Sequence, residues 1–309
     1  MKNNNTAATV ISGKKNLRYY LNGYRIFSCF NYIFLMIVVL ITLYPAYFVV
    51  VASISDPTEL QRHTGLLLAP AGDITFAAYK LVFKNPMVLS GYMNTLFILI
   101  AGVTINLIMT VIGAYFLSIK NVMFKKYIMF FIIFTMYFSG GMIPGYLNIK
   151  DLHMLDSIWS LIIPGALSTT NLIIMRTAFA AVPESLVEAA KIDGSNHLQI
   201  MMKVMVPLTK ATLAVMVLYY GVGHWNSWFS ASIYLRTPSK LPLQLVLRNI
   251  LLANQSGGMT GGVGLDEASQ LADLIKYALI VVSTAPILII YPFIQKYFTK
   301  GVMIGAIKE

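Results

Sequence analysis

The chain has 309 residues, of which 57% are hydrophobic and only 11% are charged, against roughly 45–50% and 25% in soluble domains. A helix needs about 20 residues to cross a bilayer, and several apolar runs are that long. The composition therefore excludes an ordinary soluble protein. The net charge is +11, and the single cysteine, Cys29, excludes both an intrachain disulfide and a cysteine metal cluster.

The predicted elements are all helices. The N-terminal residues are polar for too long to be a standard signal peptide, and we expect them to remain as a cytoplasmic tail. We predict six membrane-spanning helices, an all-α integral membrane fold. Their approximate ranges are 26–52, 89–118, 127–147, 158–180, 208–229 and 274–294. The predicted organisation is a tail over 1–25, one transmembrane domain over 26–295 and a second tail over 296–309.

The distribution of lysine and arginine sets the predicted orientation. The N-terminal tail, the loop 119–126, the stretch 181–210 and the C-terminal tail together hold 14 of the 23 basic residues. Because Lys and Arg gather on the cytoplasmic side of membrane proteins, we predict that both termini are cytoplasmic. This asymmetry accounts for the positive charge, so the charge does not indicate nucleic-acid binding.

The stretch 183–207, PESLVEAAKIDGSNHLQIMMKVMVP, separates the fourth and fifth predicted spans. Pro183 suits the first position of a helix, because the backbone N–H that proline lacks would have no hydrogen-bond partner within the helix there. Gly194 can take the left-handed backbone that ends a helix, and Ser195 or Asn196 can cap a second one. The stretch is therefore predicted to be a helix–turn–helix outside the bilayer.

Two carboxylates lie close together on the first of these helices. Glu184 and Glu188 stand four residues apart, and such a like-charge pair weakens an isolated helix, which Lys191 relieves only in part. One interpretation is that a carboxylate has a partner outside the helix. The other is an amphipathic helix that lies flat on the lipid surface. The physical argument alone leaves both open.

The spacing of this stretch has a specific parallel. Glu188-Ala189-Ala190, then Gly194 after three residues and Val204-Met205-Val206-Pro207 after nine more, resembles the EAA loop of ABC-importer permeases. The family pattern is EAA-x3-G-x9-I-x-L-P, and valines replace its isoleucine and leucine. Asp193-Gly194 is similar to the carbohydrate branch of the family. The resemblance extends to residues 139–144, 295–298 and 301–306, and is greatest to the complex-oligosaccharide subgroup.

The resemblance implies a type I importer permease fold with cytoplasmic EAA coupling helices in the bacterial cytoplasmic membrane. It implies that the loop docks in a cleft of an ATPase subunit, with Glu188 on a cationic group and Gly194 setting the angle between the helices. The expected ATPase-coupling residues are Glu184, Glu188, Ala189, Ala190, Asp193, Gly194 and Pro207.

The resemblance also implies partners. These are a homologous second permease, two copies of an ABC ATPase, an extracellular or periplasmic sugar-binding protein, an oligosaccharide and the bilayer; a homodimer of permeases remains open. We expect ATP and Mg on the ATPase and no cofactor on this chain.

Signs of enzyme chemistry are missing from the sequence. The four histidines are scattered without metal-ligand spacing, and no Ser/His/acid arrangement can be argued, so we expect neither catalytic residues nor a metal site. The spans also lack the deep acid that an ion-coupled carrier usually keeps, which favours an ATPase on another chain. The alternatives are an ATP-independent secondary carrier or channel, and a membrane-anchored assembly protein.

Two sets of residues are candidates for sugar handling. Sugars stack on aromatic rings and bond to amides, which makes a substrate path of Tyr219, Tyr220, Trp225, Asn226 and Trp228. The alternative is that these aromatic residues mark the membrane interface, as they do in any bundle. The glycine-rich run 254–264 lacks the lysine of a phosphate-binding loop, and the resemblance implies that it contacts the binding protein through Asn254, Gln255, Gly257, Gly258, Gly261 and Gly262.

Overall fold

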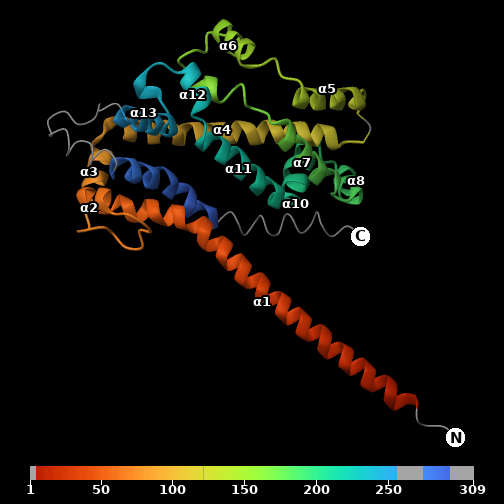
Figure 1. Ribbon diagram of the computed structural model, residues 1–309. Coiled ribbons are helices and arrows are strands. Elements are labelled where there is room, and N and C mark those ends of the chain that lie inside the picture. Colours follow the sequence, from red (N-terminus) through yellow and green to blue (C-terminus); the bar gives the residue numbers. More distant parts are fainter. Residues whose placement is uncertain (1–4, 121, 256–273, 293–309) are drawn as a thin grey trace. The chain divides into compact units, whose positions relative to one another are not determined.

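A computed structural model describes residues 5–120, 122–255 and 274–292 of the chain (Figure 1). Within these ranges every regular element is a helix, which confirms the predicted all-α class. The contacts group the chain into two compact units, Met1–Thr75 and Phe76–Glu309. The predicted boundaries of the tails and the transmembrane domain remain predictions.

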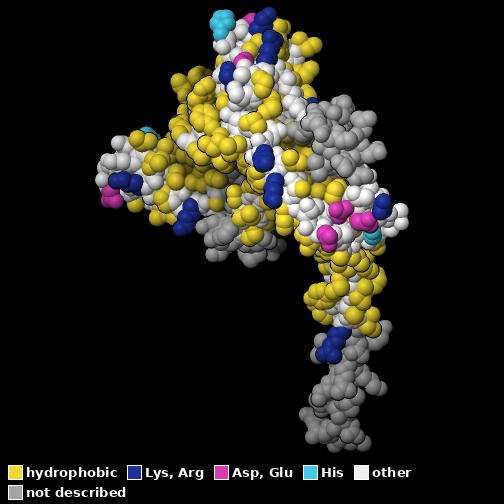
Figure 2. All heavy atoms as spheres, turned by 90° about the vertical axis from the view of Figure 1, so that its left-hand side faces the viewer, with side chains coloured by type: hydrophobic (Ala, Val, Ile, Leu, Met, Phe, Trp, Pro, Cys, Tyr) yellow, Lys and Arg dark blue, Asp and Glu magenta, His cyan; other side chains and the backbone are white. Residues whose placement is uncertain are grey.

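The first unit consists of a long helix and a short one. Helix α1 spans Asn5–Ser53 and therefore reaches into the predicted tail. Its part Tyr24–Ser53 is long and apolar enough to cross a membrane, and hydrophobic side chains cover most of its visible surface (Figure 2). Helix α2, Pro57–Arg62, begins at Asp56, whose carboxylate accepts the N–H groups of Thr58 and Glu59.

Helix α4, Pro86–Ser118, organises the second unit. It follows α3, Ala77–Lys84, and lies against α7, α11 and α13 (Figure 1). Small residues allow this packing. A Cβ atom added to Gly91 would lie 3.1 Å from the Leu243 Cα, and one added to Gly102 would lie 2.5 Å from the His224 Nε2. The glycines of α4 thus mark where its neighbours approach most closely.

Two of the predicted spans are interrupted. The third, 127–147, is divided into α5, Lys125–Tyr137, and α6, Met142–Asp151, which are bent by 113°. The break contains Gly141 at φ +90°, a conformation that favours glycine. The fourth, 158–180, is a 3₁₀ turn η1, Ile158–Leu161, followed after a Pro164-Gly165 turn by α7, Thr169–Ala180.

The remaining spans differ less from expectation. Helix α11, Lys210–Trp225, covers most of the fifth and is bent by 85° from the helical stretch before it. It is followed by α12, Phe229–Tyr234, the short turn η3, Pro238–Lys240, and α13, Leu243–Gln255. The sixth is a helix over Leu274–Pro292. Among the described residues, three helices are long and apolar enough to cross a membrane, or five spans if each bent pair counts as one. The count of six stays a prediction.

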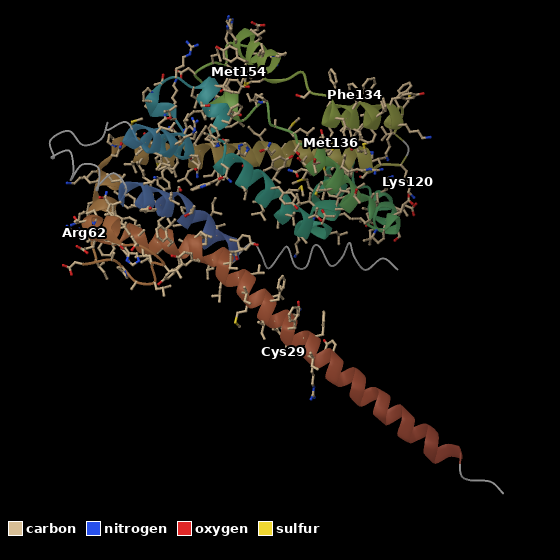
Figure 3. All side chains as sticks on the ribbon, in the orientation of Figure 1. Cys29, Arg62, Lys120, Phe134, Met136 and Met154 are labelled. Atoms are coloured by element: carbon tan, nitrogen blue, oxygen red, sulfur yellow. The ribbon has the colours of Figure 1, made fainter. Side chains whose placement is uncertain are left out.

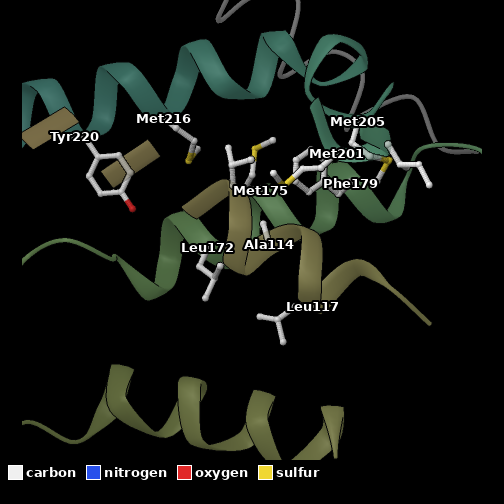
Figure 4. Close-up of a cluster of buried hydrophobic side chains, with 11 residues drawn as sticks. Ala114, Leu117, Leu172, Met175, Phe179, Met201, Met205, Met216 and Tyr220 are labelled. Carbon is white, nitrogen blue, oxygen red and sulfur yellow. The ribbon is translucent and has the colours of Figure 1, made fainter. Parts of the chain in front are cut away.

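One hydrophobic core of the second unit lies where α4, α7 and α11 meet the chain around residue 200 (Figure 4). It is rich in methionine, whose flexible thioether fills irregular gaps between helices. Its buried members are Val111, Ala114, Leu117, Leu172, Met175, Phe179, Ile200, Met201, Met205, Met216 and Tyr220.

Candidate functional site

The segment 183–207 folds as predicted into a helix–turn–helix. Helix α8 covers Glu184–Ile192, and Pro183 precedes it as the capping residue rather than forming its first turn. Gly194 has φ +76°, the left-handed conformation expected of it. The N–H of Ser195 donates to the Ala190 carbonyl at 2.9 Å and that of Gly194 to the Lys191 carbonyl at 3.0 Å. These two bonds form a Schellman motif, which satisfies carbonyls that the end of the helix leaves free.

The second helix of the segment begins at Asn196. Its side chain accepts the N–H of Gln199 at 2.9 Å, and the Gln199 side chain accepts the N–H of Asn196 at the same distance. This reciprocal capping box selects Asn196 over Ser195 as the cap. Helix α9, His197–Ile200, then continues through a π turn η2, Met201–Met205, into α10, Val206–Leu208, which contains Pro207.

One face of the segment is bound to the core. Val187 and Ala190 of α8 pack against it, and Ile200 and Met201 are buried in it. The Tyr115 hydroxyl of α4 lies 2.9 Å from the Nδ1 atom of His197. The segment is therefore attached to α4, α7 and α11 by packing as well as by the chain itself.

The opposite face is exposed and combines charge with apolar side chains. Glu184, Glu188, Ala189 and Asp193 are all exposed, and so are three large apolar side chains nearby. Leu186 keeps 44% of its accessible surface, Leu198 64% and Ile192 86%.

The two carboxylates of α8 differ in their surroundings. Lys120, which follows α4, forms an ion pair with Glu184 (Figure 3). Its hydrogen bond to Glu184 and the charge of that carboxylate raise the pKa of Lys120, with a smaller contribution from Glu188. No ion pair of Glu188 occurs within the described ranges. Sequence reasoning missed Lys120, although it lies in the basic loop assigned to the same side of the membrane.

The five predicted path residues fall into two groups. Tyr220 and Trp225 are buried. The Tyr220 hydroxyl lies 2.7 Å from the Thr110 Oγ1, and the Trp225 indole donates to the Ser283 carbonyl at 3.2 Å. Both side chains therefore join helices inside the unit. The exposed group consists of Tyr219, Asn226 and Trp228.

A buried polar cluster lies beside this region. Asn106 is fully buried, its amide donates to the Gly165 carbonyl at 2.7 Å, and its Oδ1 accepts the His224 Nε2–H at 2.7 Å. These bonds join α4, the turn before α7, and α11. Sequence alone shows only an asparagine in an apolar run, a pattern typical of helix–helix bridges.

The predicted loop contacts lie largely beyond the described residues. Asn254 and Gln255 end α13, whereas Gly257, Gly258, Gly261, Gly262 and the C-terminal residues 296–309 are outside the described ranges. In the part of the chain that the structure does describe, no three His, Cys, Asp or Glu side chains form a group that could hold a metal ion.

Comparison with known proteins places this arrangement in a family. The chain is 37% identical over 289 residues to the polygalacturonan/rhamnogalacturonan transport system permease protein YtcP of Bacillus subtilis, covering 92% of this chain and 99% of the relative. It is 26% identical to the maltodextrin transport system permease protein MdxG of the same organism, over 90% and 95%. No family model matches the chain.

A solved structure supports the same family assignment. A bacterial ABC transporter involved in the import of the acidic polysaccharide alginate contains a chain that superposes with a TM-score of 0.80 at 36% identity, over 89% of this chain and 97% of that one. This chain is an ABC-importer permease. It is a non-enzymatic membrane subunit of an oligosaccharide importer and a multi-pass protein of the inner membrane. The secondary carrier is therefore not favoured.

Proposed function

We propose that segment 183–207 of this permease is the element through which a separate ATPase drives transport. The observation that carries the proposal is the two-sided character of the segment. One face is packed into the core, through Val187 and Ile200 among others, while the other exposes Glu188 beside apolar side chains. A surface of exposed apolar and charged residues on a fixed element is what a protein partner requires.

The packing suggests how movement of the segment reaches the membrane helices. Because Ile200, Met201 and Met205 lie in one core with α4, α7 and α11, a displacement of α8 and α9 moves these helices with it. Close-packed interfaces shift between discrete arrangements rather than deform continuously. ATP binding and hydrolysis on the ATPases, where ATP and Mg would reside, would thus rock the helices between inward- and outward-facing states.

Individual residues of the segment take distinct roles in this proposal. The Glu188 carboxylate pairs with a cation on the ATPase, a charge-assisted contact worth about 1.5–3 kcal/mol. The exposed methyl of Ala189 permits close approach, Ala190 packs inward, and Gly194 holds the angle between the two helices. Glu184 is tied to Lys120 and fixes α8 against the end of α4.

The wider assembly is proposed on the same basis. Six spans with both termini cytoplasmic would place segment 183–207 at the cytoplasmic surface. A chain with one coupling segment engages one ATPase, so a second permease and a second ATPase complete the importer. The exposed apolar surfaces of α1 and α5 are available to lipid and to the second permease. The run 254–264 would face an extracellular or periplasmic binding protein.

The substrate route is proposed for a smaller set than the sequence suggested. Tyr219, Asn226 and Trp228 are exposed and can meet a passing sugar. Tyr220 and Trp225 are hydrogen-bonded to Thr110 and Ser283, respectively. They would therefore hold the helices beside the route in place rather than contact the sugar. The names of the relatives include both acidic and neutral glycans. The class of sugar must therefore be inferred from the residues of this chain.

The coupling role is tested by Glu188→Ala in the assembled importer, with Glu59→Ala of α2, outside the segment, as the control. We expect Glu188→Ala to keep the permease in the membrane but to abolish most ATP-dependent uptake of labelled oligosaccharide in cells. Glu59→Ala removes an exposed carboxylate that pairs only with Arg62 in the described part of the chain, and it should retain uptake. If Glu188→Ala transports at the wild-type rate, the coupling role of this segment is wrong.

A further inference from the structure

An arginine lies over a tryptophan ring at the surface of the unit Phe76–Glu309. The guanidinium carbon of Arg248, on α13, lies 4.4 Å from the centroid of the Trp228 ring, at the start of α12. Arg248 is exposed, and Trp228 keeps 37% of its accessible surface. The pair therefore presents a cation and part of an aromatic ring together, close in the chain to the exposed Asn226.

The helix that carries Arg248 is firmly held. The N–H of Leu243, where α13 begins, donates to the Thr95 Oγ1 of α4 at 2.8 Å. The Asn94 amide of α4 donates to the carbonyls of Ser239 and Leu241 at 2.8 and 3.0 Å. The neighbours of Arg248 are buried on the inner side of α13, namely Leu245, Val246, Leu247 and Ile250. Arg248 thus extends outward from an element with little freedom to move.

The tryptophan is also fixed in position. Its ring meets the Phe229 ring edge-on at a centroid distance of 5.5 Å. Its backbone N–H donates to the Asn226 carbonyl at 2.9 Å, and its carbonyl accepts the N–H of Ser232 at 2.9 Å. Two rigid elements therefore hold the cation and the ring in register before any ligand arrives, which reduces the ordering cost of binding.

The cation has no carboxylate partner in the described part of the chain. The ion pairs found there join Arg62 to Glu59, Lys120 to Glu184 and Lys240 to Asp156. The guanidinium carbon lies over the tryptophan ring, and none of these ion pairs uses the N–H groups of Arg248. The edge of a guanidinium group matches a carboxylate, which accepts two parallel N–H bonds from arginine.

We propose that Arg248 and Trp228 form a subsite for an acidic sugar unit, a uronate, within the imported oligosaccharide. The carboxylate binds the guanidinium edge, and the apolar C–H surface of the sugar ring lies on the exposed part of Trp228. A neutral sugar offers no counter-charge to Arg248, so the subsite discriminates by charge. The inference rests on the proposed function because it places sugar on the route beside Asn226.

The test uses the purified importer complex in nanodiscs and a labelled trigalacturonate, with its fully methyl-esterified trimer as the neutral competitor. Wild type should bind the acid at least about tenfold more tightly than the ester, the effect of one charge-assisted pair. Arg248→Gln should lose this preference and bind the two trimers alike. Arg248→Lys, which keeps the charge without the planar fork, should recover only part of it.

Two further variants distinguish the subsite from a diffuse positive field and from the coupling role. Arg236→Gln removes another exposed arginine, outside this pair, and should leave the preference intact; equal losses in Arg236→Gln and Arg248→Gln would show a diffuse field instead. Wild type without preference for the acid, or Arg248→Gln weakening both trimers equally, would overturn the proposal. Glu188→Ala should bind the acid normally, and if it also imports sugar at the wild-type rate, the coupling role fails while the subsite stands.

Discussion

The contact between Gly102 of α4 and His224 of α11 allows a sharp test of the packing. A Cβ atom on Gly102 would lie 2.5 Å from the His224 Nε2, 2.7 Å from its Cε1 and 2.9 Å from its Cδ2. All three distances are shorter than carbon and nitrogen atoms tolerate, so the ring must move. Moving it breaks the 2.7 Å bond from Nε2 to the Oδ1 of Asn106, which is fully buried.

The expected cost of Gly102→Ala follows from these terms. Overpacking costs about 1–3 kcal/mol, and an orphaned buried acceptor adds about 1–3 kcal/mol. Alanine in a helix recovers about 0.5–1 kcal/mol relative to glycine. We therefore expect a net loss of stability of about 1–5 kcal/mol, or a fall in the melting temperature of at least a few degrees.

The assay is the thermal unfolding of the purified permease complex in nanodiscs. Gly223→Ala of α11 is the matched control, because apart from its chain neighbours and the backbone of its own helix no atom lies within 4 Å of the added methyl group; it should be neutral or slightly stabilising. In a His224→Ala background the ring is absent, so Gly102→Ala should cost little. A Gly102→Ala variant as stable as wild type, or an unchanged cost in the His224→Ala background, would refute the reasoning.

Two other perturbations address loops rather than helix packing. Asp156 accepts the backbone N–H groups of Arg236 and Thr237 at 2.9 Å, together with the Thr237 hydroxyl at 2.6 Å and the Lys240 ammonium at 3.0 Å. These bonds hold the pKa of Asp156 well below its usual range, so its stabilisation is present above the unfolded pKa of about 4 and is lost as the pH falls below it. Melting temperatures from pH 7 to pH 3 should fall more for wild type than for Asp156→Asn, and parallel curves would contradict this. Gly194→Ala forces a side chain into φ +76°, at a cost of about 1–2 kcal/mol without any clash, so proteolysis between α8 and α9 should accelerate; an unchanged cleavage rate would contradict it.

Local sequence features predicted the segment 183–207 well. Its ends and its turn depend on residues close in the chain, because Gly194 and Asn196 act on neighbours at most five residues away. For the same reason the approximate position of the long apolar helix α4 could be predicted from hydropathy. The choice between Ser195 and Asn196 could not, since either side chain is chemically able to cap a helix.

The interruptions of the predicted spans were harder to foresee. Residues 127–147 are largely apolar, yet they contain Ser139-Gly140-Gly141, where the chain bends by 113°. Hydropathy measures the preference of side chains for lipid, whereas the bend depends on backbone conformation and on neighbours that accept the freed groups. The same limit applies to the turn at Pro164-Gly165 before α7.

By itself, the sequence predicted an all-helical membrane protein and, through the resemblance of residues 188–207 to an EAA loop, a permease, because hydropathy and motif spacing are local properties of the chain. Only the tertiary structure decided which polar side chains serve packing and which face outward. Asn106 meets His224 across 118 residues, and Arg248 meets Trp228 from a different helix. Such pairs form only when helices pack side by side, and a one-dimensional sequence pattern does not show which helix faces will be in contact.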